Sequence, residues 1–123
     1  MSFDLALAAE QYCYLTTTGR TSGEPREIEI WFGLDGESLY LMSGGRDRSH
    51  WVRNMRKEPA VTVRIDDLTL AGRAREVVAG SEEDALARRL LVEKYNPGYE
   101  RDLTEWGRDS LPIAVEFDRA AGG

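Results

Sequence analysis

Apolar and polar residues alternate with a period of two along much of the chain, which is the pattern of half-buried β-strands. The clearest alternation runs over Glu27–Leu34, where Ile28, Ile30, Phe32 and Leu34 fall on one face. Further strands are predicted at Tyr12–Thr18, Ser38–Ser43, Ala60–Ile65, Leu68–Val78 and Pro112–Phe117. Turn signals such as Asp35-Gly36 separate neighbouring strands, so we expect hairpin connections and mostly antiparallel pairing.

Helical periodicity interrupts this strand pattern in a few places. The strongest helix is predicted at Glu82–Tyr95, where Ser81 serves as the N-cap and Asp84 follows three positions later. A second helix starts at Asp47 or Ser49, after Gly44-Gly45, and ends at Lys57. Weaker helical segments are predicted at Asp4–Gln11 and Tyr99–Gly107. Together these elements predict an α+β fold, a small β-barrel of about six mostly antiparallel strands with two or three flanking helices.

Composition narrows the class of protein. The 123 residues are 41% hydrophobic and 31% charged, which suits one globular domain spanning residues 1–123. No apolar run approaches the roughly 20 residues of a membrane span, so we expect no stable membrane insertion. The N-terminus lacks a basic signal-peptide region, and the single cysteine, Cys13, permits no internal disulfide; both favour a cytoplasmic location. The net charge of −6 argues against general nucleic-acid binding.

Positive charge is concentrated in one segment of this acidic chain, Arg46–Lys57, which we term the basic segment. It contains five Lys and Arg residues and one acid, Asp47. Such a concentration favours a small anionic ligand that is attracted to one place. The alternative is an exposed helix face whose cations pair with acidic neighbours.

A second polar segment, Thr16–Arg26, has the features of an anion site. Gly19 and Gly23 bracket its tip, and it carries two guanidiniums, several hydroxyls and free backbone N–H groups. These groups are suited to holding an oxyanion such as a phosphate. The alternative is a polar turn with solvated arginines. Gly44-Gly45 leads into a helix within the basic segment, and helix N-termini also favour anions.

Familiar catalytic motifs are missing. The single histidine, His50, has no second His or Cys at ligand spacing, so no metal site is expected. A Ser-His-Asp triad would lack its Gly-x-Ser-x-Gly turn, and neither Gly-x-Gly-x-x-Gly nor a P-loop is present. If the protein is an enzyme, a bound cofactor carries out the difficult chemical step.

Four segments carry a resemblance to a known family: Leu15–Arg26, Leu41–Gly45, His50–Asn54 and Pro59–Val63. In this order and spacing they resemble the deazaflavin-dependent nitroreductase family, a branch of the split β-barrel proteins related to pyridoxamine phosphate oxidase. The resemblance extends from about Tyr14 to Phe117. It implies a split β-barrel oxidoreductase that binds reduced coenzyme F-420, a deazaflavin with a phosphate and a polyglutamate tail. It also implies hydride transfer to a small hydrophobic electron acceptor (a quinone, enone or nitroaromatic), by a monomer or homodimer.

The resemblance also implies a set of site residues. Those expected to meet the phosphate or tail are Arg20, Thr21, Ser22 and Arg26. Those expected along the deazaflavin and its ribityl chain are Glu27, Ile28, Glu29, Ile30, Trp31, Leu41, Met42, Ser43, Gly44, His50, Trp51, Val52, Arg53 and Asn54. Tyr95 and Tyr99 resemble the residues that close the substrate side and are the candidate catalytic residues; the alternative is an aromatic pair in the core.

Two departures from the family pattern affect these expectations. Thr21 stands where the family often has Lys or Arg, and Glu27 and Glu29 replace residues that are often small or apolar. Glu29 points either into the cofactor channel or to solvent. On the helix after Gly44-Gly45, Trp51 and Asn54 are predicted to face the cofactor while Val52 and Met55 pack inward.

Two other functions fit the same sequence features. Flavin mononucleotide (FMN) could occupy the same barrel, because the phosphate-binding groups would serve it equally. A non-catalytic carrier of a cofactor or a fatty acid is the second alternative. Pocket shape depends on several segments at once, so the sequence does not select the acceptor.

Overall fold

Seven strands form one antiparallel sheet in the computed structural model, which describes residues 5–98 and 102–117. The strands are β1 (Cys13–Thr18), β2 (Pro25–Ile30), β3 (Gly33–Asp35), β4 (Ser38–Ser43), β5 (Ala60–Ile65), β6 (Leu68–Glu76) and β7 (Leu111–Phe117). Their order in the sheet is β2-β1-β5-β6-β7-β4-β3, and every neighbouring pair is antiparallel. The α+β split barrel that the sequence predicts is therefore confirmed, with seven strands instead of about six.

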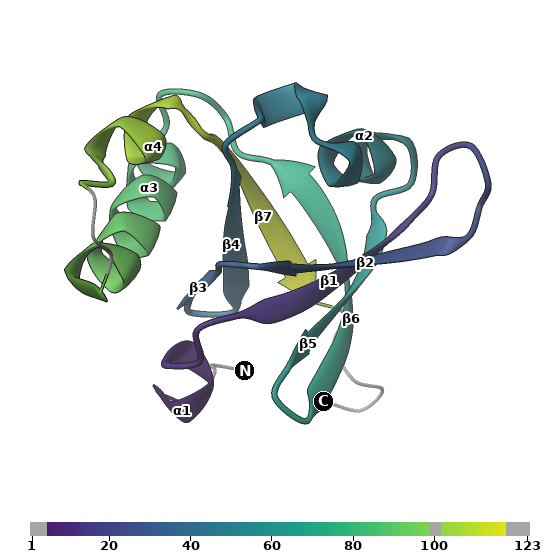
Figure 1. Cartoon of the computed structure of the whole chain (residues 1–123), viewed down its shortest axis with the longest axis horizontal. Coiled ribbons are helices and arrows are strands. Elements are labelled where there is room, and N and C mark those ends of the chain that lie inside the picture. The colour runs from purple at the N-terminus through teal and green to yellow at the C-terminus, as the bar shows by residue number, and fades with distance from the viewer. Residues whose placement is uncertain (1–4, 99–101, 118–123) are drawn as a thin grey trace.

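The two edge strands of this sheet, β2 and β3, are consecutive in the chain, and only Trp31 and Phe32 separate them. The sheet must therefore curl until its two edges meet at this link (Figure 1). The prediction of one continuous strand over Glu27–Leu34 is wrong at this point. Phe32 exchanges no ladder hydrogen bonds there; the Tyr95 hydroxyl lies 3.0 Å from its N–H and the Lys94 ammonium 2.9 Å from its carbonyl oxygen.

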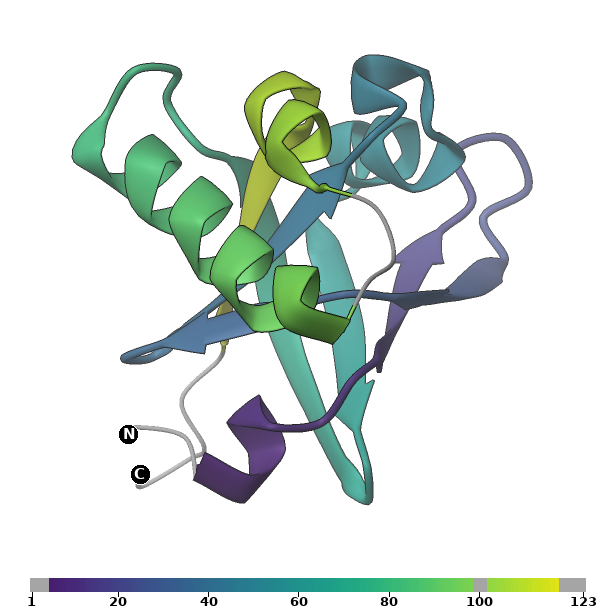
Figure 2. The same ribbon diagram turned by 60° about the vertical axis from the view of Figure 1, so that its left-hand side comes forward.

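The three longer helices occupy two separate parts of the barrel surface, and the short N-terminal helix lies apart from both (Figure 1). Among the described residues the helices are α1 (Leu5–Ala8), α2 (His50–Lys57), α3 (Glu82–Tyr95) and α4 (Thr104–Asp109), with 3₁₀ turns at Arg46–Arg48 and Asn96–Gly98. Figure 2 shows α3 and α4 together on one side, and α2 beside the β1–β2 loop on the other. None of these helices is long and apolar enough to cross a bilayer.

Two hydrophobic clusters lie on opposite faces of the sheet. The first cluster fills the barrel interior, and every strand except β2 and β3 contributes buried residues to it. Helix α2 closes one end of the barrel with Trp51, Val52 and Met55. The second cluster fills the space between the outer face and α3 with α4. Along β4, Leu39 and Leu41 belong to the first cluster and Tyr40 and Met42 to the second, so both faces of this strand are buried. Burial on both faces explains why β4 is apolar without alternation.

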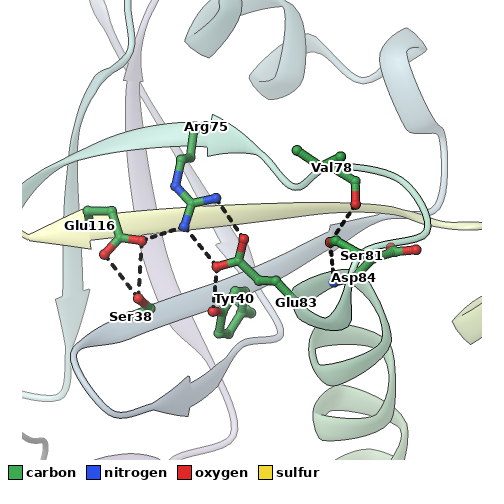
Figure 3. A network of polar contacts seen from close by, with 8 residues as sticks. All are labelled: Ser38, Tyr40, Arg75, Val78, Ser81, Glu83, Asp84 and Glu116. Atoms are coloured by element: carbon green, nitrogen blue, oxygen red, sulfur yellow. Dashed lines mark hydrogen bonds and ion pairs between the residues drawn. The ribbon is translucent and has the colours of Figure 1, made fainter.

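A polar network attaches α3 to the sheet (Figure 3). Arg75 on β6 contacts Glu83 of α3 at 2.8 Å and Glu116 of β7 at 2.7 Å. The Tyr40 hydroxyl donates to Glu83 at 2.8 Å, and the Ser38 hydroxyl donates to Glu116. This network links α3 to three adjacent strands, so the helix position is fixed by hydrogen bonds as well as by apolar packing.

Candidate functional site

A cavity of about 510 Å³ lies between the β1–β2 loop and α2. Its lining residues come from the two segments on which the sequence predictions were centred. Eight of the predicted cofactor-binding residues line it: Arg20, Thr21, Ser22, Arg26, Ile28, His50, Trp51 and Asn54. Thr17 and Gly19 line it as well and were not predicted. The alternation along β1 could have identified Thr17, because it lies on the same inward face as the buried Cys13 and Leu15 although its side chain is polar.

The loop that forms one wall of the cavity is folded back on itself. The Gly19 N–H donates to the Glu24 carbonyl oxygen at 2.7 Å, and the Gly23 N–H donates to the Gly19 carbonyl oxygen at 2.8 Å. Gly23 has a φ of +75°, which favours glycine. At Gly19 a Cβ would lie 2.8 Å from the Ser22 Oγ, so a side chain there would disturb the loop. A side chain at Gly23 would therefore be strained, and one at Gly19 would displace the Ser22 hydroxyl.

Asn54 joins the loop to α2. Its Oδ1 accepts hydrogen bonds from the Arg20 backbone N–H at 3.2 Å and from the Arg20 Nη1 at 2.8 Å. Its Nδ2 donates to the Thr17 Oγ1 at 3.1 Å. Asn54 is 3% exposed, and a buried amide with its donor and acceptor both occupied fixes the groups around it. The side chain therefore sets the position of the loop relative to the helix.

Two further α2 residues hold Arg20. Its Nη2 lies 3.2 Å from the His50 Nδ1. Because a guanidinium only donates, His50 must accept through Nδ1 in this contact. The Lys57 ammonium donates to the Arg20 carbonyl oxygen at 2.7 Å. Much of the Arg20 hydrogen-bonding capacity is thus used within the protein, although a guanidinium has five N–H groups in all.

Arg26 is the more available cation. Its Nη2 donates to the Ser22 Oγ at 3.3 Å and lies 4.0 Å from Glu24. The Arg26 side chain is 57% exposed, and Thr21 and Ser22 are exposed beside it. A guanidinium with nearby hydroxyls at the edge of a cavity is suited to a phosphate or carboxylate.

Two apolar side chains, Trp51 and Ile28, also line the cavity. Trp51 is 9% exposed and belongs to the barrel cluster, yet it also lines the cavity, as does the half-buried Ile28. Val52 and Met55 pack inward, as predicted. One side of α2 therefore presents Trp51 and Asn54 to the cavity, while the other side closes the barrel.

Most cations of the basic segment are used in structural contacts. Four of its five cations bond to protein oxygens: Arg46 to Asp109 O (2.7 Å), Arg53 to Asp47 O (2.9 Å), Arg56 to Glu76 (2.6 Å) and Lys57 to Arg20 O (2.7 Å). The alternative of pairing with acidic neighbours therefore describes Arg56, which pairs with Glu76 and lies 3.9 Å from Asp47, whereas Arg46, Arg53 and Lys57 bond to backbone carbonyl oxygens. Arg48 and Arg53 remain exposed.

Several predicted site residues lie away from this cavity. Glu27 and Glu29 are exposed on the outward face of β2, where the Tyr14 hydroxyl donates to Glu29 at 2.7 Å. Strand alternation explains this position, because their neighbour Ile28 points inward. The charge of Glu29 therefore faces solvent, which is one of the two orientations that the sequence left open.

The residues predicted along the deazaflavin from β4 and α2 are divided among several environments. Leu41 and Val52 are fully buried in the barrel cluster, and Met42 is buried in the cluster under α3. Ile30 packs against the barrel cluster. The Ser43 hydroxyl is buried and donates to the Arg46 carbonyl oxygen at 2.9 Å. None of these residues lines the cavity, whereas Gly44 is exposed beside Trp106.

Of the two candidate catalytic tyrosines, Tyr95 does not line this cavity. Tyr99 lies outside the described residues. Tyr95 is 6% exposed, and its hydroxyl donates to the Gln11 carbonyl oxygen at 2.7 Å while lying 3.0 Å from the Phe32 N–H. Its ring stacks on Trp31, with centroids 4.3 Å apart and planes 5° from parallel. Burial raises the pKa of Tyr95. This arrangement matches the alternative of an aromatic core pair, with Trp31 as the second ring.

Within residues 5–98 and 102–117, no three His, Cys, Asp or Glu side chains come together in a way that could hold a metal ion. The groups that line the cavity are two guanidiniums, the hydroxyls of Thr17, Thr21 and Ser22, the His50 imidazole, the Asn54 amide and the apolar side chains of Trp51 and Ile28.

Comparison with known proteins identifies the family and the fold of the chain. The family model described as F420H(2)-dependent quinone reductase matches residues 5–118. A solved F420-H2 dependent reductase is 30% identical, with a TM-score of 0.68 over 86% of this chain and 94% of that one. A structure described as a domain-swapped dimer is 27% identical, with a TM-score of 0.69 over 86% of this chain and 80% of the other.

A more distant relative shares the fold. A protein from Listeria innocua described as a putative pyridoxamine 5'-phosphate oxidase is 18% identical, with a TM-score of 0.66. The alignment covers 94% of this chain and 90% of that one. At this identity the similarity concerns the split barrel alone.

Proposed function

The chain belongs to the F420H(2)-dependent quinone reductase family, and from this premise we propose that it reduces a quinone in the cavity between the β1–β2 loop and α2. Membership makes it an oxidoreductase that uses reduced coenzyme F-420. The proposal concerns the acceptor and the residues that act. Its main support is the cavity itself, which is lined both by cationic and hydroxyl groups and by the apolar side chains of Trp51 and Ile28.

The residues of the cavity fit the coenzyme in chemical character. A deazaflavin with a phosphate and an acidic tail needs an apolar surface for its ring and cations for its charges. The cavity offers both, and its volume of about 510 Å³ lies in the usual range for ligand pockets. When bound, the reduced deazaflavin supplies the hydride; the protein supplies position and charge.

Arg26, Ser22 and Thr21 are the residues that we assign to the phosphate. Arg26 is more than half exposed and has only a distant, exposed carboxylate beside it, so its charge is available to a ligand. The remaining N–H groups of Arg20 can support the same anion. Exposed Arg48 and Arg53 are assigned to the tail, where contacts are weak and screened by salt.

Asn54 acts on the ligand indirectly. Its hydrogen bonds to Arg20 and Thr17 hold the loop before any ligand arrives, so less conformational entropy is lost on binding. Trp51 supplies the flat apolar wall on which a conjugated ring lies, and it excludes water from one side.

Oxidation of reduced coenzyme F-420 is the direct test. Purified protein, reduced coenzyme F-420 and menadione as the quinone are mixed anaerobically, and loss of the reduced cofactor is followed by absorbance. We expect turnover that depends on protein and on menadione. Enone and nitroaromatic acceptors, assayed at matched concentrations, should give lower kcat/KM than the quinone.

Two outcomes would contradict the proposal in different ways. Tighter binding of FMN than of coenzyme F-420 at both low and high salt would make the protein a flavin-dependent member of the fold. Binding of coenzyme F-420 without oxidation by any acceptor would make it a carrier.

A further inference from the structure

His50 is the only histidine of the chain, and it lines the cavity between the β1–β2 loop and α2. It is the first residue of α2, and its side chain is exposed. Imidazole is the side chain that ordinarily changes its charge between pH 5 and 8. The cavity therefore contains one group whose charge can change when a ligand binds.

The contact between His50 and Arg20 requires the neutral imidazole. The Arg20 Nη2 lies 3.2 Å from the His50 Nδ1. Because a guanidinium only donates, Nδ1 must accept, and the single ring proton lies on Nε2. A second proton would turn Nδ1 into a donor, and two cationic donors would then face each other. Protonation of His50 therefore breaks this contact with Arg20.

Positive charge predominates around His50. The charged groups on residues 19–26 and on the basic segment are seven cations, Arg20, Arg26, Arg46, Arg48, Arg53, Arg56 and Lys57, and two acids, Glu24 and Asp47. Both acids lie beside cations, Glu24 at 4.0 Å from Arg26 and Asp47 at 3.9 Å from Arg56. No carboxylate is among the residues that line the cavity. These surroundings oppose a positive charge on His50, whereas an anion held in the cavity favours it.

We infer that His50 takes up a proton from solvent when the cavity binds an anion, and that His50 and Arg20 then both donate to that anion. Protonated His50 supplies the new Nδ1–H and releases the Nη2–H of Arg20. Arg20 stays in place, because its backbone N–H and its Nη1 still donate to the Asn54 Oδ1. The inference rests on the proposed function only for the identity of the anion, which is then the phosphate of coenzyme F-420.

Proton uptake and anion binding must strengthen each other. The factor by which the anion favours protonated His50 equals the factor by which the proton tightens anion binding, because this coupling is reciprocal. The affinity for the anion should therefore increase as the pH falls through the titration of His50. A shift of the titration midpoint by one pH unit corresponds to a tenfold change in affinity.

The single histidine makes a direct measurement possible. In untagged protein, one Cε1–H signal in a carbon–proton NMR spectrum reports His50 alone. This signal is titrated from about pH 5 to about pH 8 in sodium chloride, in sodium sulfate of equal ionic strength and with saturating coenzyme F-420. Sulfate is a suitable probe because its charge does not change over this range. We expect each of the two anions to move the midpoint upward by about 0.5–1 pH unit relative to chloride.

His50→Asn separates the position of Arg20 from the protonation of His50. An amide oxygen at this place accepts from Arg20 as Nδ1 does, but it does not titrate. We expect wild type to bind coenzyme F-420 about three- to tenfold more tightly at pH 6 than at pH 8, after division by the same ratio for His50→Asn. The division removes any titration of the coenzyme itself. Arg73→Ala, an exposed cation outside the cavity, should keep the wild-type ratio.

The outcomes distinguish the inference from the proposed function. A His50 signal with the same midpoint in chloride, sulfate and coenzyme F-420 would overturn the inference, as would a pH dependence of binding that is unchanged in His50→Asn. Turnover with menadione would still support the proposed function in both cases. If sulfate shifts the midpoint and coenzyme F-420 does not bind at any pH, the inference stands and the proposed function fails.

Discussion

The Oδ1 of Asn54 accepts hydrogen bonds from both the backbone N–H and the guanidinium of Arg20. One side chain on α2 thereby fixes the backbone and the side chain of a loop residue 34 positions earlier. Loops are usually the mobile part of a binding site. In this protein the loop that carries the candidate phosphate ligands is attached to the barrel before ligand binds.

Asn54→Ala should detach this loop. The substitution leaves the Arg20 N–H and the Thr17 hydroxyl without their partner, so we expect the free energy of unfolding to fall by about 1–3 kcal/mol. Hydrogen exchange at Gly19 and Gly23 should become faster. Asn96→Ala is the control, because the Asn96 Oδ1 accepts the Leu103 N–H in another part of the fold. Unchanged exchange at both glycines would show that the loop is held by other contacts.

Arg26→Ala should weaken binding of coenzyme F-420 by about tenfold to a hundredfold. A charge-assisted hydrogen bond contributes roughly 1.5–3 kcal/mol, and the carboxylate of Glu24, which lies 4.0 Å from Arg26, is itself exposed and screened by solvent. Titrations at low and high salt should also show weaker binding at high salt, more for a long-tailed cofactor than for FMN. The control is Arg73→Ala on β6, an exposed cation outside the cavity. Equal losses in both variants would point to a general charge effect.

The network in Figure 3 predicts how stability changes in acid. Hydrogen bonds from Arg75 lower the pKa of Glu83 from 4.5 to about 2. A carboxyl whose pKa is lower in the folded state stabilises the fold above its unfolded pKa, and this contribution is lost as the pH falls. The free energy of unfolding should therefore decrease between pH 4.5 and 2. In Glu83→Gln that decrease should be smaller, whereas Glu93→Gln, exposed on the same helix, should behave as wild type.

Tyr95→Phe separates a structural role from a catalytic one. Loss of the hydroxyl leaves the Phe32 N–H and the Gln11 carbonyl oxygen without this partner. We expect the free energy of unfolding to fall by about 1–3 kcal/mol, with kcat for menadione reduction within threefold of wild type. A kcat reduced by a hundredfold or more at unchanged stability would instead make Tyr95 the proton donor.

Where turn, proline or capping residues mark the ends of a strand or helix, the predicted boundaries match the observed ones. Ser38–Ser43, Ala60–Ile65 and Glu82–Tyr95 have the predicted bounds, since turns, Pro59 and the Ser81 cap mark their ends. The Ser81 Oγ accepts the Asp84 N–H at 3.1 Å, as the capping pattern indicates.

Features that depend on distant residues were not predictable in this way. The break between β2 and β3 exists because Lys94 and Tyr95, more than 60 positions later, bond to the Phe32 backbone. The partner of Arg20 could not be inferred either, because the loop–helix contact is set by how the barrel closes. The alternation over Glu27–Leu34 was reliable for its two faces, since Ile30 packs against the barrel cluster and Trp31 against the cluster under α3.

The position of β7 has a consequence for the synthesis of the protein. It is the last strand of the described chain, yet it lies between β6 and β4, and its pairing brings Ser38 together with Glu116. Until β7 leaves the ribosome, β4 and β6 have no partner on these edges and the sheet remains in two pieces. Such long-range pairing makes folding slow and leaves strand edges exposed to neighbouring chains. A nascent chain that stops at Ser110 should therefore be sensitive to proteases and bound by chaperones, whereas a chain extending to Phe117 can complete the sheet.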